Sequence, residues 1–148
     1  MKPTPDRVLE VAATQLMGKI APALGSGYEQ SNAMLLAVLL SAVRQEFERA
    51  VARHVEENRE LRRLFAEAAP VVEDAGLRKR LEGAAAGEDG SLLVSDLERS
   101  NADLRGLLID LHTHVEELGS PEARRIEEAI WRELVASTER RHVSMGSS

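Results

Sequence analysis

The segment between Gly27 and Pro70 contains no glycine or proline, and its first half is apolar on nearly every side. It predicts one long helix, because the two residues that most often interrupt helices do not occur in it. The sequence Ser-Gly-Tyr-Glu at 26–29 has the form of a capping box and predicts where the helix begins. Pro70 predicts where it ends. The alternative is a break near Asn58, which would divide the segment into two helices.

The apolar half of this helix, residues 33–43, predicts burial, because a helix that is apolar all round has no side suited to water. We expect it at the centre of the fold or at a subunit interface. A helix of about 40 residues is about 60 Å long, which is more than a compact domain of this size readily hides. Unless it breaks, we therefore expect a homodimer with two-fold symmetry. The side chains expected to be inaccessible are Leu35, Leu36, Leu39, Leu40 and Val43.

Capping signals and breaks predict the other helices. Thr-Pro-Asp at 4–6 predicts the start of a first helix, which Gly-Ser-Gly at 25–27 stops. A short helix is expected over 71–81, followed by a glycine-rich loop over 83–90. Ser-Pro at 120–121 predicts the start of a last helix.

A heptad seam predicts the remaining helix. Apolar residues recur at alternating spacings of three and four from Val94 to Leu118, with Asn101 as the one polar member. Ser-Asp-Leu-Glu at 95–98 predicts a capping box at the start, and Gly119 predicts the end. The short link to the last helix predicts an antiparallel pair.

These patterns predict an all-α fold, an up-and-down bundle of four main helices plus a short fifth. Aromatic residues make up 3% of the chain, and no segment alternates β-branched residues as strands do. We expect a single helical bundle domain over residues 1–144. Residues 145–148 are expected to be a tail or a cloning remnant.

Composition excludes several functions. The chain has no cysteine, which excludes disulfides, thiolate zinc sites and iron–sulfur clusters. Its net charge of −6 argues against binding to nucleic acid. The longest apolar run is far shorter than the roughly 20 residues that a membrane span needs, and the first residues lack a signal-peptide pattern. We therefore expect a cytoplasmic protein without a membrane or nucleic-acid partner.

The histidines do not predict a metal site, and no motif predicts a cofactor or a catalytic residue. His112 and His114 lie about 200° apart around a helix and cannot chelate one ion together. The one Glu-x-x-His element, at 139–142, lies close to the end of the sequence, whereas a di-iron bundle needs two. No nucleophile elbow, phosphate loop or dinucleotide fingerprint occurs. We expect neither metal nor cofactor.

Three polar residues are candidates for binding a ligand inside the bundle. His54 falls on the apolar stripe of the long helix, where it is either a base or ligand, or a hydrogen-bonded core histidine. Asn101 either lines a pocket or fixes the register of its helix. Glu46 lies between Val43 and Phe47, and partial burial would require a partner.

The stretch from Val8 to Leu24, with Pro-Ala-Leu at its end, resembles the opening of a family of small uncharacterised bacterial helical proteins. Gly27-Tyr28 through Glu46 resembles the tyrosine-containing second helix of that family, while the chain from Val55 onward departs from it. Such proteins are often encoded beside acyl-CoA dehydrogenases and aminoglycoside-phosphotransferase-like proteins. The resemblance implies an accessory role near acyl-thioester metabolism and supplies no catalytic residue.

Two function classes follow. The first is a non-catalytic helical module that binds itself or a protein partner, supported by the long apolar helix and the lack of catalytic motifs. The second is a bundle that holds a small apolar or acyl-type ligand, either as a binding protein or as an enzyme. The second class requires a cavity of several hundred Å³ with His54, Asn101 and Glu46 as its polar anchors.

Overall fold

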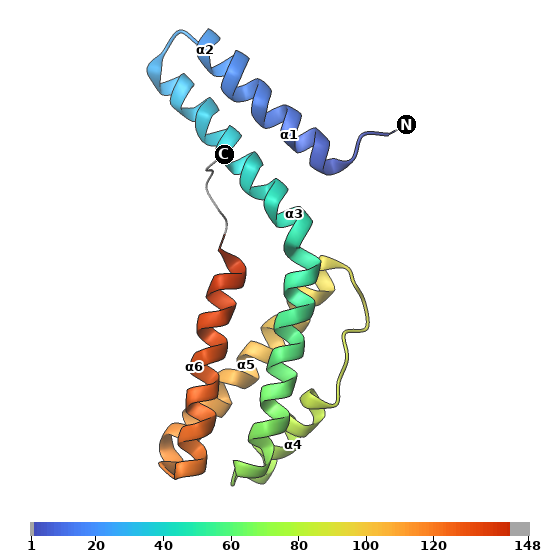
Figure 1. The fold of residues 1–148 in the computed structure, drawn as a ribbon, viewed down its shortest axis with the longest axis vertical. Coiled ribbons are helices and arrows are strands. Elements are labelled where there is room, and N and C mark those ends of the chain that lie inside the picture. The colour runs from blue at the N-terminus through green and yellow to red at the C-terminus, as the bar shows by residue number, and fades with distance from the viewer. Residues whose placement is uncertain (1, 143–148) are drawn as a thin grey trace. The chain divides into compact units, whose positions relative to one another are not determined.

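The structure, a computed structural model, describes residues 2–142, in which every regular element is helical (Figure 1). This confirms the all-α class, with four main helices and the short α4 as a fifth. The bundle is of the up-and-down kind, since successive helices within each part of the chain run in alternating directions (Figure 1). The elements are α1 (Pro5–Gln15), the π-helical turn η1 (Leu16–Ile20), α2 (Ala21–Ala23), α3 (Gly27–Ala68), the 3-10 turn η2 (Ala69–Val71), α4 (Ala75–Ala85), α5 (Val94–Leu118) and α6 (Pro121–Arg141).

The described residues divide into two compact units. Residues 2–50 form the N-terminal unit and residues 51–142 the C-terminal unit, and α3 contributes to both. The single domain expected over 1–144 stays a prediction. The tail expected at 145–148 lies outside the described residues.

The N-terminal unit is a helical hairpin, in which α1 runs beside the first part of α3 (Figure 1). The Thr4 hydroxyl accepts a hydrogen bond from the Arg7 backbone N–H at 3.4 Å, which confirms the predicted start of α1. Pro22 has no N–H to donate, and its ring crowds the carbonyl four residues earlier. The wider π-turn η1 lies directly before α2 and accommodates this proline within one continuous helical segment. Asp6 on α1 pairs with Arg44 on α3.

Helix α3 is continuous through Asn58, so the alternative of a break there is wrong. The Ser26 hydroxyl accepts from the Glu29 backbone N–H at 3.2 Å, as the capping pattern predicted. Pro70 lies in η2 directly after the helix, which confirms the predicted end.

The burial expected for residues 35–43 is wrong in the single chain. Leu35, Leu36, Leu39 and Val43 are between 51% and 56% exposed, and Leu40 is half-buried. The buried residues of this part of α3 are alanines at 33 and 37. Alanines also fill the buried positions of the first helical segment, at 13 and 21. In the N-terminal unit, α1 covers one narrow side of α3. The small side chains of α3 occupy that side, so its large side chains face outward.

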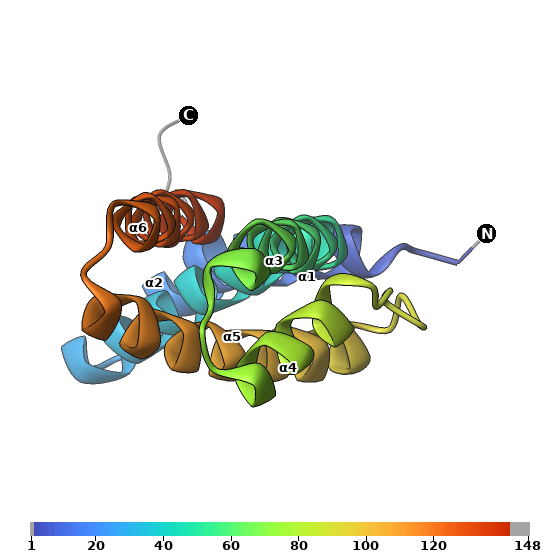
Figure 2. The ribbon, with the colours of Figure 1, turned by 90° about the horizontal axis from the view of Figure 1, so that it is seen from below.

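The C-terminal unit contains the main hydrophobic core, to which α3, α4, α5 and α6 all contribute (Figure 2). The seam of α5 is buried from Leu97 to Val115, as predicted, whereas Val94 is partly exposed. Gly119 ends α5 in the left-handed conformation, at φ 60°, where residues with a Cβ are strained. Ser120 then caps α6 by accepting from the Ala123 N–H at 3.1 Å. The largest fully buried apolar side chains are Leu61, Phe65, Val72, Leu81, Leu97, Leu111, Val115 and Ile130.

Two local predictions in this unit need correction. Helix α4 begins at Ala75, with Asp74 as its cap, and it continues through Gly83, so the loop begins later than expected. The capping box expected at 95–98 is also wrong. The N–H groups of Asp96 and Leu97 both donate to the Leu93 carbonyl, so α5 already begins at Val94 and residues 95–98 lie inside its first turns.

Candidate functional site

A buried polar cluster surrounds Glu57, whose side chain is fully inaccessible in the core of the C-terminal unit. Arg141 donates from Nε to Glu57 Oε1 at 3.0 Å and from Nη2 to Oε2 at 2.6 Å. The Ser137 hydroxyl donates to Oε1 at 3.2 Å, and the Asn101 amide donates to Oε2 at 3.3 Å. The Arg105 guanidinium lies 3.9 Å from Oε2. We call these five residues the Glu57 cluster.

Asn58 connects this cluster to a second, half-buried ion pair between Arg62 and Asp89. Its amide nitrogen donates to Asp89 Oδ1 at 3.0 Å, and its oxygen accepts from Asn101 at 2.9 Å. Asp89 also accepts from Arg62 at 2.8 Å and from the Ser100 hydroxyl at 3.0 Å. The 86–93 loop is thereby attached to α3 and α5 through polar contacts.

The electrostatics of both carboxylates favour the charged form. Burial by itself would raise the pKa of Glu57, but the hydrogen bonds and charge of Arg141, with help from Ser137 and Arg105, outweigh it and lower that pKa. Burial would likewise raise the pKa of Asp89, and the bonds from Arg62, Ser100 and Asn58 lower it. A carboxylate with a lowered pKa and occupied oxygens is a poor general base. The arrangement therefore holds helices together, and its chemistry does not suit proton transfer.

The three candidate ligand-binding residues lie in different surroundings in the structure. Asn101 is buried within the Glu57 cluster, where Arg141 also donates to its oxygen at 3.2 Å. His54 is buried one turn before Glu57 on α3. Glu46 is half-buried and belongs to the N-terminal unit. The contacts of Asn101 account for its position on the seam without a ligand.

His54 has few polar partners. Its Nε2 lies 3.2 Å from Arg53 Nη2 and 3.9 Å from Glu98 Oε1, and its Nδ1 has no hydrogen-bond partner among the described residues. Burial, followed by the charge of Arg53, lowers the pKa of His54. The surroundings of the ring therefore favour its neutral form.

Two hollows lie in the C-terminal unit, and none of His54, Asn101 and Glu46 lines either of them. One, of about 280 Å³, lies between α3 and α6 and is lined largely by charged residues such as Arg63, Glu67 and Arg140. The other, of about 540 Å³, lies between α3 and the loop that contains Asp89 and Leu92. The three residues are thus not anchors of either hollow.

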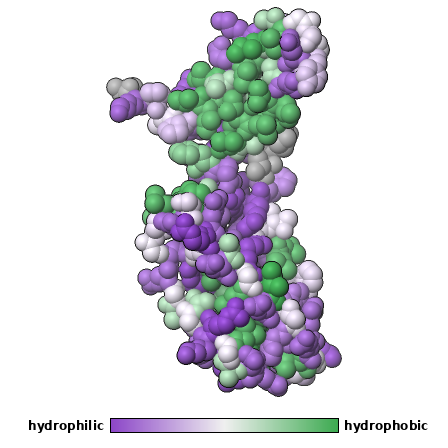
Figure 3. Space-filling view, turned by 180° about the vertical axis from the view of Figure 1, so that it is seen from behind, coloured by the Kyte–Doolittle hydropathy of each residue, from purple (hydrophilic) through white to green (hydrophobic). Residues whose placement is uncertain are grey.

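The N-terminal unit carries an extensive apolar surface (Figure 3). Leu36, Leu39, Val43 and Phe47 recur at spacings of three and four, which places them on one stripe of α3. We define the apolar surface as the large apolar side chains of this unit that are at least 40% exposed: Val8, Val11, Met17, Ile20, Met34, Leu35, Leu36, Leu39, Val43 and Phe47.

One group in the described part of the chain has the spacing of metal ligands. His112 and Glu116 on α5 and Glu127 on α6 each offer one ligand atom, and these atoms all lie within 4.8 Å of one another. His112 also packs against Trp131, with ring centroids 5.5 Å apart and the rings nearly perpendicular.

Comparison with known protein families, with curated proteins and with solved structures found no match to this chain. Within residues 2–142, no helix is both long enough and apolar enough to span a membrane.

Sequence reasoning missed Glu57 and Arg141, although one signal for Glu57 was present. The α3 stripe passes from His54 to Leu61, and the positions between them on that stripe are Glu57 and Asn58. Two polar residues in an otherwise apolar stripe indicate a buried polar contact. Nothing local marks Arg141, which lies in the charged last turn of α6.

Proposed function

We propose that this protein is a non-catalytic helical interaction module that associates with a second copy of itself. The observation that carries the proposal is the apolar surface of the N-terminal unit. Two such hairpins with their apolar surfaces together form a four-helix arrangement, which buries side chains that a single hairpin leaves in water. A two-fold dimer is the commonest closed assembly of this kind.

The size of the apolar surface supports an interface. Ten large side chains, each about half exposed, present on the order of 700 Å² of apolar area. The largest apolar patch on a typical monomer covers about 300–600 Å². Each partner in a standard protein interface contributes about 800 Å². Summed over all sides of the unit, this exposed apolar area is large for a free monomer, and the stripe of Leu36, Leu39, Val43 and Phe47 places part of it on one side of α3.

The state of the Glu57 and Asp89 carboxylates supports a role without catalysis. The oxygens of Glu57 and Asp89 are occupied by donors from neighbouring helices, and both carboxylates are stabilised in the charged form. We place the module in the bacterial cytoplasm, in an accessory role near acyl-thioester metabolism. That part of the proposal rests on the resemblance of residues 8–24 and 27–46.

Sedimentation equilibrium at tens of micromolar tests self-association. We expect a dimer of the 16.2 kDa chain. Leu39→Glu and Val43→Glu should convert it to a monomer with unchanged helical circular dichroism, because each places a charge in the apolar surface. Leu92→Glu is the matched control, since Leu92 is 68% exposed but lies in the C-terminal unit. A wild-type protein that sediments only as a monomer, or variants that dimerise as the wild type does, would contradict the proposal.

A further inference from the structure

We propose that His112, Glu116 and Glu127 form a binding site for Zn²⁺ or a neighbouring divalent transition-metal ion. The three side chains come from the two helices of the α5–α6 hairpin, on either side of the turn at Gly119. Their ligand atoms lie within 4.8 Å of one another. This site differs from the sequence expectation, which considered pairs of histidines and the bundle stripes but not a histidine with carboxylates across the hairpin.

The spacing suits coordination. His112 and Glu116 are four residues apart on α5 and therefore share one side of the helix. His112 Nε2 lies 3.5 Å from Glu116 Oε1. Two ligands of a tetrahedral zinc ion, with bonds of about 2.1 Å, lie about 3.4 Å apart. This pair already has the separation of two zinc ligands, and a carboxylate oxygen of Glu127 lies within 4.8 Å of both ligand atoms.

The Nε2 atom of His112 lies close to the Glu116 carboxylate but forms no hydrogen bond with it. This nitrogen is inaccessible to solvent and has no hydrogen-bond partner among the described residues. Buried polar atoms usually have a hydrogen-bond partner, because an unsatisfied one costs free energy. Glu116, by contrast, is 56% exposed, which leaves a route for an ion from solvent.

The donor set selects the class of ion. One imidazole and two carboxylates suit Zn²⁺, Co²⁺ and Ni²⁺, whereas Mg²⁺ and Ca²⁺ prefer oxygen ligands alone. Three protein ligands leave a fourth tetrahedral position open to water. A bound ion would also connect α5 to α6 near their shared turn and stabilise the hairpin.

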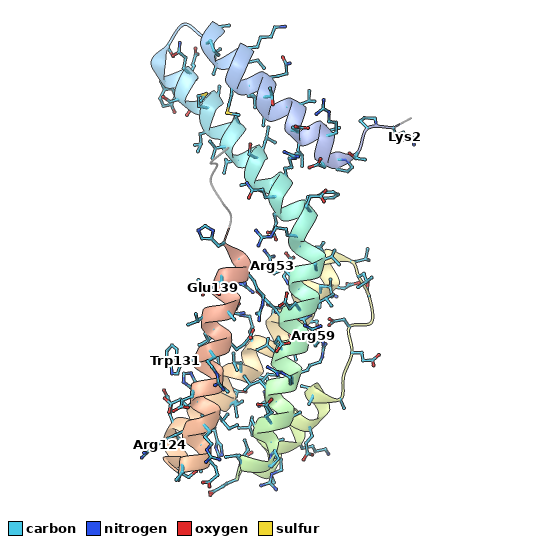
Figure 4. The ribbon with its side chains drawn as sticks, in the orientation of Figure 1. Lys2, Arg53, Arg59, Arg124, Trp131 and Glu139 are labelled. Carbon is cyan, nitrogen blue, oxygen red and sulfur yellow. The ribbon has the colours of Figure 1, made fainter. Side chains whose placement is uncertain are left out.

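The fluorescence of Trp131, the only tryptophan of the chain, provides a direct readout of metal binding. Trp131 lies on α6 (Figure 4) against the His112 ring, so a Co²⁺ ion bound to His112 lies close enough to quench its fluorescence. Zn²⁺ has a filled d shell and does not quench by this route. Titration with Co²⁺ should give saturable quenching at one ion per chain, which Zn²⁺ reverses by displacement and excess Mg²⁺ does not.

Substitutions then assign the ligands, with Zn²⁺ calorimetry as a second readout. Glu116→Gln and Glu127→Gln should each weaken binding at least tenfold, and His112→Asn should abolish it. Glu117→Gln and Glu128→Gln are matched controls, because both are exposed neighbours outside the group, and each removes the same charge. The proposal is overturned if neither ion binds saturably below millimolar concentration, or if the ligand variants bind as tightly as the controls.

Discussion

Arg141, in the last turn of α6, forms a two-bond ion pair with Glu57 in α3, and the two residues are 84 positions apart in the chain. The carboxylate is fully buried, whereas the guanidinium is partly exposed. Arg141 therefore connects the end of α6 to α3 through an ion pair at the edge of the core of the C-terminal unit. It also supplies the main counter-charge to a buried carboxylate, which Arg105 reaches only at 3.9 Å.

Replacing Arg141 with methionine should lower the free energy of unfolding by about 1–3 kcal/mol, because Glu57 keeps its bonds from Ser137 and Asn101 but loses its main counter-charge. Urea denaturation measures this change. Arg125→Met on the exposed side of α6 is the control and should stay within about 0.5 kcal/mol of the wild type. With Glu57→Gln already present, the cost of Arg141→Met should shrink. Equal effects at positions 141 and 125 would contradict this account.

Asn101→Leu should destabilise the protein by about 1–3 kcal/mol, although leucine extends the apolar seam. The substitution removes the Asn101 donor from the oxygen of Asn58, one of several donors from Glu57 and one acceptor from Arg141. An asparagine that serves only to set register lowers stability, so its replacement by leucine would raise the melting temperature. Thermal unfolding distinguishes the two roles. Leu104→Met, a volume-conserving change on the same seam, should cost less than about 1.5 kcal/mol.

Stability should fall as the pH is lowered, in two stages. Because the pKa of His54 is lowered in the folded chain, the unfolded chain takes up a proton at this residue more readily than the folded chain does. The free energy of unfolding therefore declines as the pH falls below about 6.5. The lowered pKa values of Glu57 and Asp89 stabilise the fold above their ordinary values of 4.5 and 3.8. That contribution is lost as the pH falls through the folded values.

Urea unfolding between pH 7 and pH 3 tests both stages. Glu57→Gln should flatten the acid stage, and His54→Asn should flatten the stage near neutrality, because each removes one titrating group. A profile for Glu57→Gln that runs parallel to the wild type would show that this carboxylate is not held in its charged form.

The helices could be predicted from the sequence because their signals are local. Thr4, Ser26 and Ser120 cap the helices that they were expected to cap, and Pro70 and Gly119 end theirs. Capping, helical period and helix termination depend on hydrogen bonds and sterics within about four residues, so a short stretch of sequence contains all that they need.

Burial and polar pairing were decided only by the tertiary structure. The apolar pattern predicts that Leu36 and Leu39 avoid water, but it does not show which segment covers them. In the single chain, α3 buries its alanines instead. Asn101 was recognisable as polar on a seam, yet its partner Glu57 is 44 residues away and Arg141 is 40 residues away on the other side. Such contacts depend on which helices meet and at which register, and no local spacing determines that.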